Sequence, residues 1–247
     1  MSEFQRIHVS RSADLAAAAC AEEVLSSLQA AIDERGTAFL AVSGGATPKL
    51  LFHHLSQASF DWDKVNLFFV DDRAVPPEDD QSNYKLAHLH FIEPAGLNHV
   101  HRIRTELDPP KAADQYVADI REVFGLDDGE FPIFDVMQMG LGDDAHTASL
   151  FPGEVMIQNH DGIAAALYVQ KKAQWRITLL PRVILDSRQL VFLVAGQDKE
   201  QAFASVFGER VNPLEYPAQF IARSEHPNIR WFIDNAARGD RELPALA

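Results

Sequence analysis

The sequence is poor in cysteine, in positive charge and in long apolar segments. Cys20 is the only cysteine among 247 residues, which excludes an intrachain disulfide and a cysteine-based metal site. No apolar run approaches the length that a membrane-spanning helix needs. The segment from Met1 to Arg11 is polar and lacks the apolar core of a signal peptide. We therefore expect a cytoplasmic protein that has no contact with a membrane.

Positive charge is scarce, since the sequence has 22 lysine and arginine residues against 36 aspartate and glutamate residues, which gives a formal net charge of −14. Nucleic acids and anionic membranes bind basic surfaces, so we expect neither as a partner. A small anionic substrate remains compatible with this charge, since a phosphate site needs only a few local donors and cations. The sequence does not indicate an oligomeric state.

Short apolar segments of strand length alternate with helical patterns along the chain. Because these strands are apolar on both sides, the pattern predicts an α/β fold with a mostly parallel, doubly wound sheet and helices on both faces, and a small second lobe remains open. Without repeats or a linker-like segment, we expect residues 1–247 to form a single domain. The predicted strands are 37–42, 65–70, 134–139, 163–169, 189–194 and 229–233, and the predicted helices are 12–35, 47–55, 111–124 and 199–207.

Unusual polar or glycine-rich segments follow several of these strands, at the sheet edge where ligands of α/β proteins bind. One is Ser43-Gly44-Gly45-Ala46-Thr47-Pro48, in which Thr47 suits a helix N-cap and Pro48 a first helical position. Free N–H groups there, with two hydroxyls, would hold a phosphate. A plain strand-to-helix turn is an equal alternative. Ser43 is not expected to be an esterase nucleophile, because Ala41 stands where that motif has glycine.

The segment Gly140-Leu141-Gly142-Asp143-Asp144-Ala145-His146 formally matches a dinucleotide-binding fingerprint. We reject that interpretation because Asp143 and Asp144 would repel a pyrophosphate. A glycine turn that presents two carboxylates and a histidine remains, and the unperturbed pKa of histidine, about 6.5, suits proton transfer near neutrality. A structural histidine that caps a loop is the alternative for His146.

Three basic residues are candidates for binding an anion. Arg73, in Asp71-Asp72-Arg73, could orient a carboxylate or stabilise a developing oxyanion, or it could lie in a solvated loop with an internal ion pair. Arg176 and Lys199 could each reach a phosphate or be plain surface charges. Histidine pairs elsewhere have no carboxylate spacing typical of a metal site, so we predict no metal.

Taken together, these segments resemble the 6-phosphogluconolactonase family, which is related to glucosamine-6-phosphate deaminase/isomerase. The resemblance runs in order from about residue 5 to residue 237, and the segment around His146 is its most specific part. The matching segments are Ser43 to Pro48, Asp71 to Arg73, Ser82-Asn83-Tyr84, Gly140 to Pro152, Arg176-Ile177-Thr178-Leu179 and Gly196-Gln197-Asp198-Lys199.

The resemblance implies hydrolysis of 6-phospho-D-glucono-1,5-lactone to 6-phosphogluconate, in the oxidative branch of the pentose phosphate pathway. His146 would be the general base that activates water, supported by Asp144, and Arg73 would bind near the reacting end or the developing oxyanion. No metal or organic cofactor is implied, because a lactone is an activated ester. The residues that would bind the substrate are Ser43, Gly44, Gly45, Thr47, Arg176 and Lys199, at the 6-phosphate, and Asp71.

Two positions depart from the family pattern, and two rival functions remain open. The family often has glycine where Ala145 stands, which implies strain if that backbone needs a positive φ. It usually has glutamate where Asp72 stands, which puts a role for this carboxylate in doubt. The rivals are a deaminase/isomerase, whose family has tyrosine at the position of Arg73 and a glutamate after the histidine, and a non-enzymatic sugar-phosphate sensor.

Overall fold

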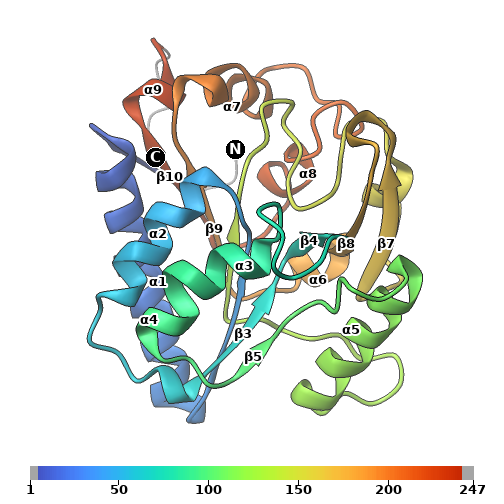
Figure 1. Ribbon diagram of the computed structural model, residues 1–247. Helices are drawn as coiled ribbons and strands as arrows, with labels where there is room; N and C mark the ends of the chain where they lie inside the picture. Colours follow the sequence, from blue (N-terminus) through green and yellow to red (C-terminus); the bar gives the residue numbers. More distant parts are fainter. Residues whose placement is uncertain (1–4, 241–247) are drawn as a thin grey trace.

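A parallel sheet of seven strands runs through the computed structural model, which describes residues 5–240 (Figure 1). The strands lie in the order β1-β10-β9-β6-β2-β3-β5, and each neighbouring pair is parallel. This confirms the predicted α/β class. Their bounds are β1 (Gln5–Ser10), β2 (Ala38–Val42), β3 (Val65–Phe69), β5 (Val100–His101), β6 (Val136–Met139), β9 (Leu190–Val194) and β10 (Ile229–Asp234).

The chain builds this sheet outward in two directions from its middle. From β2 it adds β3 and then β5 on one side, and from β6 it adds β9 and then β10 on the other. The neighbours β2 and β6 are therefore the point at which the strand order reverses, where α/β sheets leave a crevice beyond the carboxyl ends of the strands. The segments that follow these two strands begin at Ser43 and Gly140.

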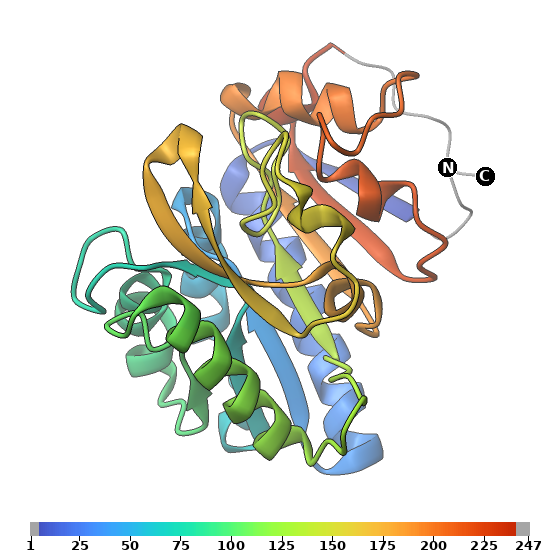
Figure 2. The same ribbon diagram turned by 90° about the vertical axis from the view of Figure 1, so that its right-hand side faces the viewer.

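A second, antiparallel sheet stands beside the first and contains β4 (Asp71–Arg73), β8 (Gln174–Leu179) and β7 (Ala164–Val169), in the order β4-β8-β7. Figure 2 shows its β7–β8 hairpin in gold above the green helix α5 (Pro109–Phe124). The strand predicted at 163–169 is confirmed as β7, which lies in this antiparallel sheet. Residues 71–73 form a strand, so the solvated-loop alternative for Arg73 is wrong. The strand at 174–179 was not predicted from the sequence.

Helix α1 (Ala13–Arg35) begins and ends where its capping residues predict. The Ser12 hydroxyl accepts a hydrogen bond from the N–H of Leu15, and Gly36 ends the helix at a φ of 80°. Leu15, in its first turn, is 52% exposed. The helix is also long and apolar enough in composition to cross a membrane, contrary to expectation, but its apolar residues Val24, Leu28 and Ile32 are buried in the protein core.

The remaining helices cover the sheets, and α5 fixes the end of β3. The buried Tyr116 hydroxyl donates to the carbonyl of Phe69 at 2.6 Å and accepts from its N–H at 2.9 Å. The chain therefore leaves β3 at a fixed point and passes into β4. The other α-helices are α2 (Ala46–Ser56), α3 (Asn83–Ala87), α4 (Glu93–Ala95), α6 (Pro181–Leu185), α7 (Glu200–Val206), α8 (Gln219–Ala222) and α9 (Asn235–Arg238), with 3₁₀ turns at Trp62–Lys64, Val155–Gln158, Gln170–Lys172 and Gln197–Lys199 and a π turn at His88–Ile92.

One apolar core contains residues from both sheets. Val42 and Phe69 of the parallel sheet and Ile177 and Leu179 of the antiparallel sheet belong to the same buried cluster. The second sheet is thus packed onto the first through shared apolar burial, which stabilises their relative position. That residues 1–247 form a single domain stays a prediction.

Candidate active site

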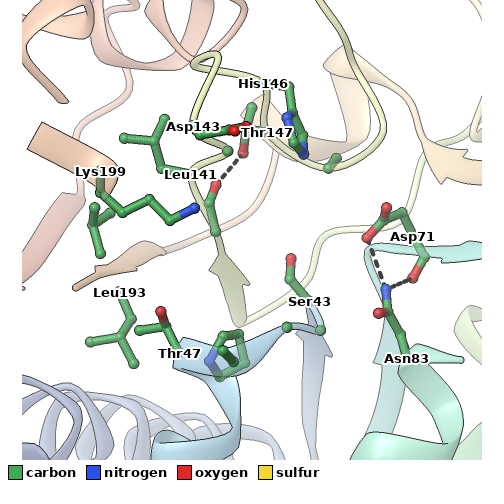
Figure 3. A pocket seen from close by; sticks show the side chains of 18 of the residues that line it. Ser43, Thr47, Asp71, Asn83, Leu141, Asp143, His146, Thr147, Leu193 and Lys199 are labelled. Atoms are coloured by element: carbon green, nitrogen blue, oxygen red, sulfur yellow. Dashed lines mark hydrogen bonds between the residues drawn. The ribbon is translucent and has the colours of Figure 1, made fainter. Parts of the chain in front are cut away.

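A cavity of about 300 Å³ opens beyond the carboxyl ends of β2 and β6 (Figure 3). Segments from both sheets line it, so residues distant in the sequence face one another across a single space. Nine of the ten predicted site residues line this cavity, and the tenth, Asp144, lies behind His146. The nine are Ser43, Gly44, Gly45, Thr47, Asp71, Arg73, His146, Arg176 and Lys199.

The imidazole of His146 is held by Asp144. Its Nδ1 lies 2.6 Å from Oδ1 of Asp144, which also accepts the backbone N–H of His146. Burial raises the pKa of Asp144, but hydrogen bonds from His146 and Lys171 outweigh burial, so this pKa lies well below its usual value. An ionised carboxylate only accepts hydrogen bonds, so in the neutral imidazole Nδ1 carries the proton and Nε2 carries the lone pair. The ring is paired with a side chain and lines the cavity, which supports a role as a general base, and that role stays a prediction.

Glycine and phenylalanine fix the plane of this ring. A Cβ atom on Gly142 would lie 1.9 Å from Nδ1 of His146, so only glycine leaves room for the imidazole there. Phe151 also stacks on the ring, with centroids 4.1 Å apart. Ala145, between Asp144 and His146, adopts a φ of 63°, so the departure from glycine at this position does carry backbone strain.

The carboxylates of this loop form, with His146, the one group among residues 5–240 that has the geometry of a metal site. The potential ligand atoms of Asp143, Asp144 and His146 lie within 4.8 Å of one another. However, both oxygens of Asp144 already accept hydrogen bonds. Oδ1 pairs with the imidazole of His146, and Oδ2 accepts from the ammonium of Lys171 at 2.6 Å. A cation at this carboxylate would have to displace Lys171, so the donor set fits an ion pair better than a metal.

The turn after β2 leads into α2 with an uncapped end. Gly45, not Thr47, is the N-cap residue, at a φ of 115°, and no side chain caps the helix. The Thr47 hydroxyl is in the first turn and faces the cavity (Figure 3). The hydroxyl of Ser43 donates to the carbonyl of Gln138, whose side chain accepts the Ser43 N–H. Gln138, which sequence reasoning missed, thus ties this turn to β6.

A buried amide holds the opposite wall. Asn83 donates from Nδ2 to the carbonyl and to Oδ1 of Asp71, at 2.8 and 3.3 Å. The other oxygen of Asp71 accepts from the hydroxyl of Ser149 at 2.5 Å. A Cβ atom on Gly44 would lie 1.9 Å from Oδ1 of Asn83, so this glycine is required by the amide beside it. Asn83 was visible only as part of the matched Ser82-Asn83-Tyr84 motif, without a role.

The neighbouring Asp72 is structural. Its carboxylate is 1% exposed and accepts the backbone N–H groups of Arg73, Asn83 and Tyr84, which anchors the start of α3 to β4. Burial raises the pKa of Asp72 to about 6, although these hydrogen bonds lower it. Asp72, which is shorter than the family's usual glutamate, therefore has a clear structural function, because it anchors the start of α3.

The three basic residues occupy different environments. Arg176 is 7% exposed, with its guanidinium 3.9 Å from Asp71 and over the ring of Phe151, and burial lowers its pKa. The surface-charge interpretation is therefore wrong for Arg176. Arg73 donates to the carbonyl of Gln81 at 2.6 Å, and its buried Nε has no hydrogen-bond partner in the described part of the chain. The side chain of Lys199 extends into the cavity (Figure 3).

Comparison with known proteins agrees with this geometry. Residues 11–231 match the family model described as glucosamine-6-phosphate isomerases/6-phosphogluconolactonase. The chain belongs to this family. It is 35% identical over 210 residues to the 6-phosphogluconolactonase of Synechocystis sp., which covers 84% of this chain and 86% of the relative. It is 32% identical to the probable 6-phosphogluconolactonase of Schizosaccharomyces pombe, over 88% and 89% of the two chains.

Solved structures of the same family share the fold. The 6-phosphogluconolactonase of Shewanella baltica OS155 superposes with a TM-score of 0.83 and 27% identity, over 93% of this chain and 97% of the other. A monomeric glucosamine-6-phosphate deaminase superposes with a TM-score of 0.79 at 14% identity, over 94% and 98%, which shows the common fold alone. Both branches of the family thus use this architecture, and the residues in the cavity must distinguish them.

Proposed function

We propose that this protein hydrolyses 6-phospho-D-glucono-1,5-lactone to 6-phosphogluconate, acting in the cytoplasm without a metal or organic cofactor. The observation that carries the proposal is the Asp144–His146 pair, which faces the uncapped end of α2 across one cavity. A base at one end and an anion site at the other match a substrate with a reactive carbonyl and a remote phosphate. The names of the relatives support the same reaction.

The phosphate binds in this proposal at the start of α2. The N–H groups that follow Gly45 have no side-chain cap, and the positive end of a helix dipole favours an anion. The Thr47 hydroxyl and the Lys199 ammonium line the same part of the cavity (Figure 3). Ser43 and Gly44 shape the turn, and Arg176, beside Asp71, adds positive charge within the wall.

Hydrolysis then needs one proton to move twice. Nε2 of His146 removes a proton from water as the water oxygen bonds to C1 of the lactone, and Asp144 stabilises the imidazolium that forms. Arg73, whose Nε has no partner in residues 5–240, stabilises the negative charge on the carbonyl oxygen. As the tetrahedral intermediate collapses, the bond from C1 to the ring oxygen breaks, and the imidazolium returns its proton to that oxygen. The product is an open-chain acid.

The deaminase alternative is disfavoured by what occupies the space beside the base. That branch carries a glutamate shortly after the histidine, and this chain has Phe151, whose ring stacks on His146. A carboxyl group is therefore missing from that position, and Arg73 stands where that branch has tyrosine. A sensor without catalysis would not need a histidine that a partly buried carboxylate holds with Nε2 towards the cavity.

The test is a coupled assay with freshly generated 6-phosphogluconolactone, corrected for spontaneous hydrolysis, beside an assay for ammonia release from glucosamine 6-phosphate. We expect lactone hydrolysis, and a loss of about 10²- to 10⁴-fold in kcat for His146→Ala with little change in ligand affinity. His160→Ala, at an exposed histidine outside the cavity, is the matched control. Ammonia release, or unchanged turnover in His146→Ala, would contradict the proposal.

A further inference from the structure

A lysine on the antiparallel sheet reaches the loop of the proposed base. Lys171 lies in the 3₁₀ turn Gln170–Lys172 that joins β7 to β8, and its side chain is 60% exposed. Its ammonium lies 2.6 Å from Oδ2 of Asp144, whose own side chain is only 14% exposed. The contact thus joins two segments that are 27 residues apart in the sequence.

The two oxygens of Asp144 have separate partners. Oδ1 faces the imidazole and the N–H of His146, whereas Oδ2 faces Lys171. An exposed ion pair usually contributes little to stability. This pair differs because its carboxylate is largely shielded from water and directly hydrogen-bonded to a ring in the cavity. A change at Lys171 therefore acts on the imidazole through one shared carboxylate.

We propose that Lys171 is a positioning residue for the lactone hydrolysis proposed above, because its ammonium fixes the orientation of the Asp144 carboxylate and so sets how tightly His146 binds a proton. Without Lys171 the Oδ2 oxygen loses its partner, and the full negative charge of the carboxylate acts on the imidazole. The turn between β7 and β8 thereby takes part in a reaction whose cavity it does not line.

Other charges also face the imidazole. Asp143 lies on the same loop, Arg176 lies across the ring of Phe151, and Arg73 and Lys199 line the same cavity. Those four charges belong to the cavity lining, so a change at any of them would alter the substrate site as well. Lys171 lies outside the lining, so its effect on the base is separable from effects on binding.

The test compares Lys171→Met with Lys172→Met. Both variants remove one positive charge from the same turn and keep a long side chain, but only Lys171 has a contact with Asp144 among the interactions of residues 5–240. We expect Lys171→Met to move the acid limb of the kcat/KM profile to higher pH by about half a unit, the size expected for two charges on opposite sides of a carboxylate in a water-like dielectric. On that limb the rate then falls about threefold. Lys172→Met should follow the wild type, and Lys171→Arg should restore the wild-type profile.

A second measurement does not depend on activity. Nuclear magnetic resonance of the His146 imidazole, assigned with His146→Asn, should show the same rise in its titration midpoint in Lys171→Met. The proposed role of Lys171 is wrong if the pH profiles and imidazole titrations of Lys171→Met and Lys172→Met are the same, whether both equal the wild type or both are shifted. Absence of lactone hydrolysis by the wild type would instead overturn the proposed function, while the imidazole titration would still test Lys171.

Discussion

The two glycine turns of the cavity use glycine for different reasons. In the turn after β2, Gly44 makes room for the amide of Asn83, and Gly45 adopts a left-handed φ of 115° at the start of α2. In the loop after β6, Gly142 makes room for the ring of His146, while the left-handed position there is filled by Ala145 at 63°. A glycine in such a motif therefore does not by itself indicate close approach of a ligand.

The two turns differ in the group that each glycine leaves room for. Gly142 borders the proposed base, so a side chain there should affect the chemical step. Gly44 borders a wall that holds Asp71 through Asn83, so a side chain there should affect binding and folding. The carboxylates behind the turns differ too, since the pKa of Asp144 is lowered and that of Asp72 is raised.

The largest effect is expected from Gly142→Ala. Its Cβ would lie 1.9 Å from Nδ1 of His146, so the ring must leave Asp144. We expect kcat to fall about 10²- to 10⁴-fold, as for loss of a general base, with a nearly unchanged KM. Steady-state kinetics together with thermal unfolding would check this. A large rise in KM at constant kcat would contradict the assignment of this loop to the chemical step.

The next effect concerns the stability contributed by Asp72. The pKa of Asp72 in the folded protein, about 6, lies above its ordinary value of 3.8, so its contribution is fully present below pH 3.8 and is lost as the pH rises towards 6. The loss is at most about 3 kcal/mol. In Asp72→Asn, which cannot titrate, this fall between pH 4 and pH 6 should disappear. Urea unfolding of both proteins across that range measures it, and parallel curves would refute the prediction.

A smaller effect is expected from Gly44→Ala. Because its Cβ would overlap Oδ1 of Asn83, the amide must move and loosen its hold on Asp71. We expect a loss of about 1–3 kcal/mol in the free energy of unfolding, typical of overpacking, and a rise in KM that exceeds the change in kcat. Should kcat fall as strongly as in Gly142→Ala, the two turns would not have the separate roles argued above.

The smallest effect is expected from Ala145→Gly. Glycine relieves the strain of the left-handed backbone but loses a buried methyl group and gains entropy in the unfolded chain. These contributions nearly cancel, so the free energy of unfolding should rise by less than about 1 kcal/mol. Chemical denaturation would measure it, with kcat as the control. A clear loss of stability would show that the alanine methyl matters more than its backbone.

Local patterns predicted much of the parallel sheet, because its strands are apolar on both faces and follow helices with recognisable caps such as Ser12 and Gly36. Of the antiparallel sheet, β7 was predicted from its apolar residues, but β4 and β8 were not, since Asp71 to Arg73 and the start of β8 are polar and become strands by pairing with each other. Strand β1 lies in a segment that the sequence analysis described only as polar, and it is a strand for the same reason, through its pairing with β10.

The cavity was predictable where a motif follows a strand, as at Ser43 and His146. The residues that hold those motifs in place could not be predicted, because their contacts join distant segments of the chain. Gln138 reaches Ser43 across 95 residues, and Lys171 reaches Asp144 from another sheet. The spacing of residues along the sequence does not indicate such long-range contacts. Thr47 was placed two positions too late for an N-cap for a simpler reason, since the N-cap is Gly45 and the helix begins at Ala46.

The pairing of β1 with β10 has a consequence for the order in which the protein assembles. These two strands lie at opposite ends of the described chain, yet β1 forms its backbone ladder only with β10. During synthesis β1 must therefore stay unpaired until β10 has emerged from the ribosome. Loop closure over such a separation is slow. This edge of the sheet should be among the last parts to form and the first to be lost when the chain is truncated at its carboxyl end.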